Sequence, residues 1–398
     1  MKNLDVAIVG AGPYGLSIAA HFSGLGLNFQ IFGKPMEVWR GHMPEDMLLK
    51  SDGFASSLSA PQGSHTLKDF CEARGIPYHD TDIPVALSVF TDYAMDFQRR
   101  FVPGLDRRMV ASIVPDGDAF VLRLEDGEEI AAKKVILAAG ITHFAHMPEP
   151  LTGFDKALVS HSSDHRQFAR FRNREVTVVG AGSSAVDVAA HLIESGANVN
   201  LVTRSPSIVF SSEPRDDHRR GAWHKLRYPS SGLGPGLKSR LYCDWPHLFR
   251  YLPPSLRLNI VRRHLGPFSI WYMRSKVMGK ANVIQGVELD RLAVKGNRVA
   301  LTLSADGRPV RQVESDHVIA ATGYKVELSR LHFLDGAIRR RVRTATTMPV
   351  LSPFFESSHK GLYFVGFAAA GSFGPLMRFM FGAEFVSHRI AQHFGAQH

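Results

Sequence analysis

Cysteine is nearly absent from this chain, which has only Cys71 and Cys243 among its 398 residues. Two cysteines outside any Cys-x-x-Cys spacing exclude a dithiol redox centre of that type and a disulfide framework. Residues 1–5 lead directly into an apolar strand instead of a signal peptide, and no uninterrupted apolar run reaches the length of a membrane span. These absences predict a cytoplasmic protein.

The sequence patterns of several other kinds of catalysis are missing as well. The sequence contains no catalytic triad, no paired-carboxylate signature and no spaced set of metal ligands, so we expect no metal centre. The cluster Asp216-Asp217-His218 with His224 lacks a second ligand set and is interpreted as a charged loop. Acidic residues are outnumbered, 37 against 47 basic ones, which gives a net charge of +10. The basic residues are dispersed, which favours attraction for phosphate-bearing cofactors over nucleic-acid binding.

Glycine, in contrast, marks two dinucleotide fingerprints. The first runs Gly10-Ala11-Gly12-Pro13-Tyr14-Gly15, and the second runs Gly180-Ala181-Gly182-Ser183-Ser184-Ala185. Each follows an apolar run with strand character and opens a stretch with helical periodicity, the context that distinguishes a genuine fingerprint from a chance match. Two such turns predict two bound dinucleotides in one chain.

The physical role of each fingerprint position is distinct. The first glycine permits the tight turn, the second lets the backbone approach a pyrophosphate, and the third position must be small so that helix and strand can pack. The pyrophosphate then lies at the helix N-terminus, where free N–H groups favour negative charge. The fingerprint residues expected to contact the cofactors are Gly10, Gly12, Pro13 and Gly15 in the first turn, and Gly180, Gly182, Ser183 and Ser184 in the second.

The remaining pattern predicts an α/β chain built from two Rossmann-like three-layer domains. The first βαβ unit ends at residues 28–32, and a β meander fills 108–139. The second βαβ unit spans 174–202, followed by two strands within 294–303 and a returning strand at 316–324. A last strand at 361–367 and a terminal helix at 375–394 complete the first domain. Residues 206–280 interrupt this pattern and suggest a mostly helical insertion.

This arrangement, with Ala321-Thr322-Gly323-Tyr324 after the returning strand, resembles the flavoproteins with two dinucleotide-binding domains. Within them it resembles the class B flavin-dependent monooxygenases, which comprise flavin-containing, N-hydroxylating and Baeyer–Villiger groups. In that family the first fingerprint binds FAD, the second binds NADPH, and the Ala-Thr-Gly motif links the domains. The resemblance implies an FAD-binding domain at 1–150 and 325–398, and an inserted NADPH-binding domain at 151–324.

Further cofactor contacts follow from the resemblance. Trp39 corresponds to a tryptophan beside the flavin, and Val110 to a strand position that pairs with adenine. The resemblance also assigns the isoalloxazine and its ribityl chain to Gly366, Gly374 and Pro375, and the link between the cofactors to Thr322 and Gly323. The glutamate that usually ends the second FAD strand, and binds the adenosine ribose, is replaced here by Gly33.

The second cofactor is expected to be NADPH. Arg204 and Ser205 follow the second strand of the second βαβ unit, where an acidic residue would bond both ribose hydroxyls of NAD. An arginine there suits the 2′-phosphate of NADP through its planar fork, and Ser205 adds a hydroxyl donor. The alternative is an exposed arginine at a strand end.

Three residues are candidates for a catalytic role. Lys50 and Ser51 lie in the loop after Trp39, which should cross the flavin face, and both can donate hydrogen bonds to the flavin or its oxygen adduct. The alternative is a surface lysine and a turn serine. His161 is a candidate for contact with the nicotinamide nucleotide, or a loop histidine with ordinary hydrogen bonds.

The resemblance implies an FAD- and NADPH-dependent monooxygenase that forms a flavin C4a-peroxide and oxygenates a small molecule with molecular oxygen, with nitrogen favoured as the oxidised atom. The cofactors would supply the hard chemistry. Two alternatives stay open. One is an FAD-dependent NAD(P)H reductase or dehydrogenase without oxygen insertion. The other is a non-catalytic NADP-binding or redox-sensing protein.

Overall fold

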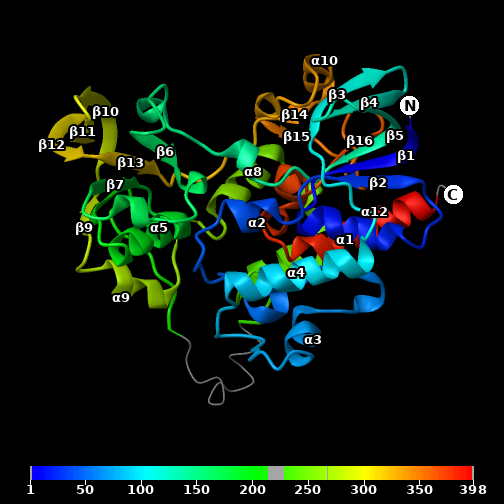
Figure 1. Ribbon diagram of the computed structural model, residues 1–398, viewed down its shortest axis with the longest axis horizontal. Helices are drawn as coiled ribbons and strands as arrows, with labels where there is room; N and C mark the ends of the chain where they lie inside the picture. The colour runs from blue at the N-terminus through cyan, green and yellow to red at the C-terminus, as the bar shows by residue number, and fades with distance from the viewer. Residues whose placement is uncertain (1, 214–227, 267, 397–398) are drawn as a thin grey trace.

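The computed structural model describes residues 2–213, 228–266 and 268–396, and two sheets with parallel cores organise them (Figure 1). The cluster Asp216-Asp217-His218 and His224 lies outside the described residues. Strand order in the first sheet is β2-β1-β5-β4-β3, with β16 also paired to β5. Its strands are β1 (Lys2–Val9), β2 (Phe29–Phe32), β3 (Val110–Asp116), β4 (Ala119–Leu124), β5 (Glu129–Leu137) and β16 (Leu362–Phe364).

Strand β5 joins the two ends of the chain in one sheet. Its first half pairs antiparallel with β4, where Phe120 opposes Ala132. Its second half pairs parallel with β16, where Leu362 opposes Val135. The meander and the C-terminal strand therefore share one edge of β5, and residues close to the C-terminus complete the sheet that begins at the N-terminus.

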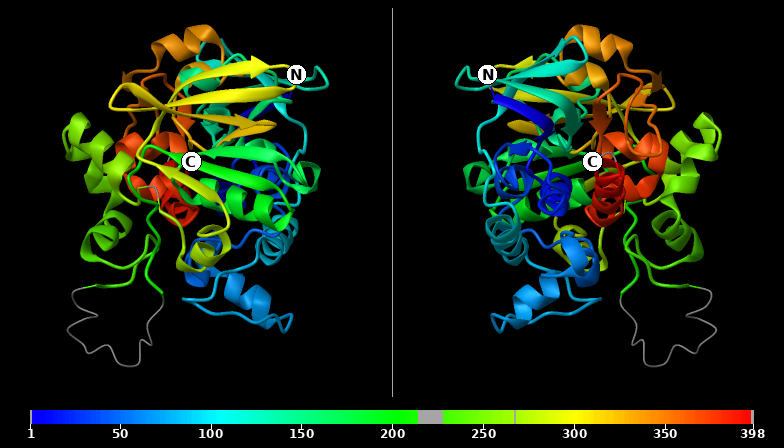
Figure 2. Two further views of the ribbon diagram at one scale, coloured as in Figure 1. Left: turned by 90° about the vertical axis from the view of Figure 1, so that its left-hand side faces the viewer. Right: turned by 90° about the vertical axis from the view of Figure 1, so that its right-hand side faces the viewer.

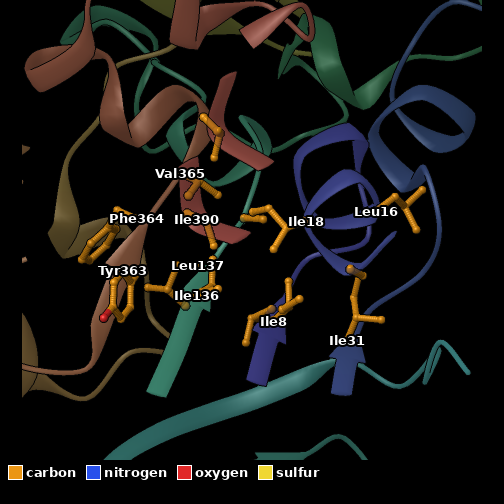
Figure 3. Packing of buried hydrophobic residues seen from close by; sticks show 14 of the residues in the cluster. Ile8, Leu16, Ile18, Ile31, Ile136, Leu137, Tyr363, Phe364, Val365 and Ile390 are labelled. Atoms are coloured by element: carbon orange, nitrogen blue, oxygen red, sulfur yellow. The ribbon is translucent and has the colours of Figure 1, made fainter. Parts of the chain in front are cut away.

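Helices α1 (Pro13–Phe22) and α12 (Gly382–Gly395) pack against each other beside this sheet (Figure 1). Figure 3 shows the core between them, in which Ile8, Ile136 and Tyr363, in register on three strands, lie near Ile18 and Ile390 from the two helices. All five side chains are fully buried. Burial of apolar surface on this scale dominates the stability of the fold and fixes the ends of β1 and β5, where the first glycine turn lies.

The second sheet is parallel throughout, in the order β6-β13-β7-β8-β9. Its strands are β6 (Val159–His161), β7 (Glu175–Val179), β8 (Asn198–Thr203), β9 (Asn282–Gln285) and β13 (His317–Ala320). Helix α5 (Ser183–Glu194) packs on β7 and β8. The predicted architecture of two Rossmann-like domains, one inserted in the other, is confirmed.

A separate antiparallel sheet corrects one expectation. Instead of two strands within 294–303, the structure has β10 (Glu288–Lys295), β11 (Arg298–Ala305) and β12 (Arg308–Ser315). The turn at Gly296 was placed correctly. Strand β12 was missed because it is an edge strand whose charged residues are mostly exposed, so its apolar signal is weak.

The expected terminal helix over 375–394 is also corrected. The structure has a 3₁₀ turn at Pro375–Arg378 and only then α12, which begins at Gly382. Gly374 has φ +87°, and Tyr14 donates its hydroxyl hydrogen to the carbonyl of Phe379 at 2.7 Å. That bond takes a carbonyl which a continuous helix would use internally.

The insertion is mostly helical in its described part, as expected. It contains α7 (Leu237–Asp244), α8 (Pro254–Arg263) and α9 (Arg274–Val277). The other helices and the remaining hairpin are α2 (Glu37–Gly41), α3 (Leu67–Glu72), α4 (Leu87–Phe101), α10 (Gly336–Arg341), α11 (Ala370–Phe373), β14 (Thr344–Ala345) and β15 (Met348–Pro349). Short 3₁₀ turns occupy Gly53–Ala55, Pro61–Gly63, Thr142–Phe144, Glu149–Leu151, Ser162–Asp164, Ala169–Phe171, Pro246–Tyr251, Trp271–Met273, Leu328–Arg330, Gly366–Ala369 and Pro375–Arg378. Within the described ranges, no helix is both long and apolar enough to cross a bilayer.

Candidate functional site

The first glycine turn has the shape that a pyrophosphate requires. Gly10 ends β1 with φ +113°, and a Cβ atom there would lie 2.2 Å from the carbonyl oxygen of Ala138. A Cβ on Gly15 would lie 1.9 Å from the carbonyl oxygen of Gly10. A Cβ on Gly12, at φ −86°, would meet no atom within 4 Å. The outer glycines are therefore needed for packing, and Gly12 faces open space at the helix N-terminus, where a pyrophosphate fits.

The second turn repeats this geometry at the end of β7. Gly180 has φ +153°, and a Cβ on it would lie 2.4 Å from the carbonyl oxygen of Ala321 and 3.1 Å from the Cβ of Ala185. The small side chain of Ala185 is therefore needed for the close packing of α5 against Gly180. Helices α1 and α5 both start without a side-chain cap and without an acidic residue in the first turn. Both N-termini therefore keep free N–H groups and a positive dipole end for an anion.

The two segments that cross between the domains are matched in structure. Gly140 and Gly323 occupy equivalent positions after Ala138 and Ala321, with φ +70° and φ +76°. Each crossing presses its alanine carbonyl against the first glycine of one fingerprint. Ala138-Ala139-Gly140 therefore has the same packing role as Ala321-Thr322-Gly323.

The crossings are hydrogen-bonded to each other as a short antiparallel pair. The amide of His146 donates to the carbonyl of Gly323 at 2.9 Å, and the amide of Lys325 donates to the carbonyl of Phe144 at 2.8 Å. The hydroxyl of Thr322 donates to the carbonyl of His146. Thr322 and Gly323, expected at the link between the cofactors, thus lie in the joint that fixes the two domains.

His161 lies at the end of β6 beside this joint. Its Nδ1 accepts the amide N–H of Ser163 at 3.2 Å, so Nε2 carries the proton and donates to the carbonyl of Gly323 at 3.2 Å. Its ring lies edge-on to Tyr324, with centroids 5.3 Å apart. Burial lowers the pKa of His161, so the ring is neutral near pH 7. Both ring nitrogens are engaged within the protein.

Lys50 connects the loop after the first site to the helix of the second. Its Nζ lies 2.9 Å from Asp187 Oδ1 on α5 and 5.8 Å from the centre of the Tyr272 ring. The Lys50 side chain is 22% exposed and that of Asp187 is 6% exposed. Burial raises the pKa of Asp187, and the ammonium of Lys50 opposes that rise. Ser51, the neighbouring candidate, contacts the hydroxyl of Ser56 at 2.9 Å.

Further hydrogen bonds fasten α2 and this loop to the second domain. His42 Nδ1 contacts the carbonyl of Ser163 at 3.0 Å, and Gln167 donates to Glu45 at 2.9 Å. Arg166 donates to the carbonyl of Arg40. A surface groove of about 470 Å³ runs along this junction, lined by Glu45, Asp164, His165, Arg166, Gln167 and Arg170. None of the residues expected to hold a cofactor lines this groove.

The remaining FAD candidates lie on α2, on β3 and in the segment after β16. Trp39 on α2 packs edge-on against Phe90, with centroids 4.9 Å apart, and Val110 is buried at the start of β3. A Cβ on Gly366 would lie 3.2 Å from the Tyr14 ring, and one on Gly374 3.0 Å from Phe249. Gly366 therefore lets the C-terminal segment approach the fingerprint helix closely, whereas Gly374, followed by Pro375, lets it approach the insertion.

Gly33 stands at the end of β2, where the resembling family usually has a glutamate, and its backbone shows why no other residue is favoured there. It is buried, its φ is +123°, and its amide donates to the carbonyl of Asp106 at 2.9 Å. A Cβ there would lie 3.5 Å from the amide nitrogen of Ala11. Strain at this φ disfavours any other residue, so the next residue, the exposed Lys34, carries the first side chain beyond β2.

At the second site, Arg204 follows β8 with an exposed side chain. Within the described residues no ion pair or hydrogen bond engages its guanidinium. Ser205 donates its hydroxyl hydrogen to the carbonyl of Ser207 at 2.7 Å. The sequence interpretation missed Asp187. The available signal was an acidic residue among the apolar positions of α5, between Val186 and Val188.

Comparison with known proteins agrees with this geometry. A family model described as FAD-NAD(P)-binding matches residues 7–142, and one described as pyridine nucleotide-disulphide oxidoreductase matches residues 90–217. The probable indole-3-pyruvate monooxygenase YUCCA1 of Arabidopsis thaliana is 26% identical, over 92% of this chain and 86% of its own length.

Two solved structures show the same fold. The ornithine N-hydroxylase KtzI of Kutzneria sp. 744, with reduced FAD, NADP⁺ and L-ornithine, superposes with a TM-score of 0.76 at 16% identity, over 99% of both chains. The bacillithiol disulfide reductase of Bacillus cereus gives a TM-score of 0.66 at 18% identity, over 100% of both chains.

The fold and its two glycine turns define a flavoprotein with two dinucleotide-binding domains, one for FAD and one for NAD(P). Within that class the chain is similar to the flavin-dependent monooxygenases, the enzymes that its sequence resembles. Such enzymes act on small molecules with molecular oxygen. The observed turns at Gly12 and at the start of α5 fit the two cofactors.

Proposed function

We propose that this enzyme uses NADPH and FAD to transfer one atom of molecular oxygen to a nitrogen atom of a small molecule. The observation that carries the proposal is the contact between Lys50 and Asp187 at 2.9 Å. Lys50 lies in the loop after the first dinucleotide site and Asp187 on the helix that starts at the second. The contact supports an arrangement in which the two sites face each other, as reduction of one nucleotide by the other would require.

The preference for NADPH rests on charge at the end of β8. Arg204 is exposed there without a partner among the residues that the structure describes, and no acidic residue stands at that position. A guanidinium fork matches a phosphate in a bidentate geometry, whereas NAD would require an acceptor for its ribose hydroxyls. Arg204 and Ser205 are proposed to hold the 2′-phosphate.

The choice of nitrogen rests on likeness in fold and loop sequence. The ornithine N-hydroxylase KtzI shares the fold over nearly its full length. The Met47-Leu48-Leu49-Lys50-Ser51 loop and the Ala321-Thr322-Gly323-Tyr324 segment resemble the N-hydroxylating group. An amine is therefore the class of substrate to test first.

When bound, FAD would supply hydride acceptance and oxygen activation, as the resemblance implies. Gly12 and the free amides of α1 are proposed to bind its pyrophosphate, and Trp39 to border its ring. Lys50 and Ser51 are proposed to donate hydrogen bonds at the flavin face. For Lys50 this requires an ammonium that exchanges Asp187 for the cofactor.

His161 is proposed to be a positioning residue for the segment beside the nicotinamide. Its Nε2–H holds the carbonyl of Gly323 at 3.2 Å, and its ring borders Tyr324. It thereby fixes the crossing beside which the nicotinamide would lie. A neutral, internally bonded ring is suited to orienting this segment, and less suited to moving a proton.

Rapid-mixing spectroscopy tests the proposed function. The FAD-loaded enzyme is reduced anaerobically with NADPH or NADH and then mixed with oxygen, with and without amines, while the flavin spectrum is recorded. Faster reduction by NADPH, a C4a-peroxide spectrum and an N-hydroxylated amine detected by mass spectrometry would support the proposal. Oxygen consumption that yields only hydrogen peroxide with every amine would favour the reductase alternative. Failure to bind FAD would favour a non-catalytic NADP-binding protein.

A further inference from the structure

Three arginines meet at the joint between the helical insertion and the C-terminal elements. Arg250 belongs to the 3₁₀ turn Pro246–Tyr251, Arg257 to α8 and Arg389 to α12. Helix α11 packs against both the 3₁₀ turn and α8. Both views of Figure 2 show the light-green insertion helices beside the orange and red C-terminal segments. These three residues are referred to as the arginine cluster.

One loop anchors two members of the cluster. Arg250 donates from Nη2 to the carbonyl of Leu351 at 3.4 Å, and Arg389 donates from Nε to the carbonyl of Pro353 at 2.6 Å. The two acceptors are separated by a single residue, so both guanidinium groups are held near each other. Within the described residues, no hydrogen bond engages their other nitrogens, which remain available to an external acceptor.

Arg257 is the unexplained member. Arg257 as a whole is only 7% exposed, and its Nε is buried without a hydrogen-bond partner among the described residues. Burial and the charge of Arg250 lower the pKa of Arg257, and the same two causes lower that of Arg389. Arg250 thus repels both Arg257 and Arg389 in a partly desolvated place, which is unfavourable unless an anion joins them.

Among the described residues, no carboxylate forms an ion pair with these arginines. The sequence has no aspartate or glutamate between Asp244 and Glu288, a stretch that includes the 3₁₀ turn and α8. Glu356, the first acidic residue after the anchoring loop, accepts the amide of Gly361 at 2.8 Å. Helix α8 also begins without a side-chain cap and without an acidic residue in its first turn.

We propose that the arginine cluster binds a small oxyanion, through a phosphate or carboxylate group, at a site separate from both dinucleotide turns. Guanidinium forks recognise these groups by paired N–H bonds, and three of them match a group that carries more than one negative charge. The bound anion would join α8 to α12 and to the loop at Leu351. Because α11 packs on α8 and leads to Gly374, occupancy would also stiffen the segment expected beside the flavin.

The test measures anion binding to the enzyme saturated with FAD and NADP⁺, so that both dinucleotide sites are occupied. Inorganic phosphate is titrated by calorimetry at constant ionic strength, and citrate in a second series. Saturable binding is expected for the wild type, with affinity at least tenfold lower in Arg257→Met. Arg262→Met is the matched control, because Arg262 is exposed on the same helix. Tighter binding of citrate would identify a carboxylate ligand, and tighter binding of phosphate a phosphate ester.

Two results would overturn the proposal. One is the absence of saturable binding of either anion to the wild type. The other is equal affinity in the wild type and in Arg257→Met. If Arg257→Met does not fold, Arg389→Gln and Arg250→Gln replace it, since both side chains are only partly buried. Calorimetry is preferred to a melting shift, because phosphate also stabilises folded proteins without binding at a site.

Discussion

Lys50 and Asp187 form an ion pair between the two domains, with 2.9 Å between Nζ and Oδ1. The carboxylate is almost fully buried on α5, whereas the ammonium comes from a loop of the other domain. Removing one partner leaves a buried charge uncompensated, and removing both does not. Because of this difference, single and double variants can measure the coupling between the two side chains.

We expect Lys50→Met and Asp187→Asn each to lower the free energy of unfolding by about 1–3 kcal/mol, the usual penalty for an unpartnered buried polar group. The double variant should lose less than the sum of the two. Urea unfolding of the four proteins measures this coupling. Lys68→Met is the control, because Lys68 and Glu72 form an exposed pair at 4.0 Å that should contribute almost nothing. Strictly additive losses would show that the pair does not hold the domains.

Arg204→Gln should raise KM for NADPH by about 10- to 100-fold and leave KM for NADH unchanged. The estimate corresponds to one charged hydrogen-bonding group, about 1.5–3 kcal/mol. Steady-state flavin reduction with each coenzyme measures it. Arg298→Gln, in an exposed ion pair on β11, provides the matched loss of charge. An equal rise in KM for both coenzymes would show that Arg204 does not bind the 2′-phosphate and is an ordinary surface residue.

Gly12→Ala and Gly10→Ala should separate cofactor binding from folding. A Cβ on Gly12 meets nothing in the protein, so Gly12→Ala should keep its melting temperature while its methyl group occupies the space for the pyrophosphate. FAD affinity should then fall at least tenfold. Gly10→Ala should not fold stably, because its Cβ would lie 2.2 Å from the carbonyl of Ala138 at φ +113°.

Gly104→Ala is the control for this pair, since a Cβ there also meets no atom within 4 Å. It should change neither stability nor FAD affinity. Flavin fluorescence quenching and thermal melting read the two properties independently. Unaltered FAD affinity in Gly12→Ala would place the pyrophosphate elsewhere.

Local sequence determined the elements that position the two turns. The fingerprints, the meander and the βαβ units depend on glycine at a few positions and on alternation within a few residues, so they were predicted from pattern alone. Strand β6, with three residues, and the charged edge strand β12 carry too little apolar signal to be recognised.

The contacts between domains could not be predicted in this way. Lys50 and Asp187 belong to distant segments, and so do His42 and Ser163, whose 3.0 Å contact joins the loop after α2 to the second domain. Such pairs depend on how two sheets are placed relative to each other, which no local periodicity encodes. His161 was recognised as a candidate from its position, but its internal partners became visible only in the fold.

A directional chain of hydrogen bonds inside the second domain is sensitive to pH. Arg170 donates to His165 Nδ1 at 2.9 Å, and His165 Nε2 donates to the hydroxyl of Ser160 at 2.6 Å. Ser160 then donates to His317 Nε2 at 2.7 Å, and His317 Nδ1 donates to the carbonyl of Ala157 at 2.9 Å. Because arginine only donates and a carbonyl only accepts, this single pattern requires both histidines to be neutral.

Lowering the pH should therefore destabilise the protein over a defined pH range. Burial, with the charge of Arg170, lowers the pKa of His165 from 6.5 to about 4, and burial lowers that of His317 as well. Between these values the unfolded chain binds more protons than the folded one, so the free energy of unfolding falls as the pH drops from about 6.5 towards 4. Urea midpoints from pH 4.5 to 8 should show this slope, and His165→Gln, which cannot take up a proton, should flatten it. An equal slope in both proteins would assign the acid sensitivity to other histidines.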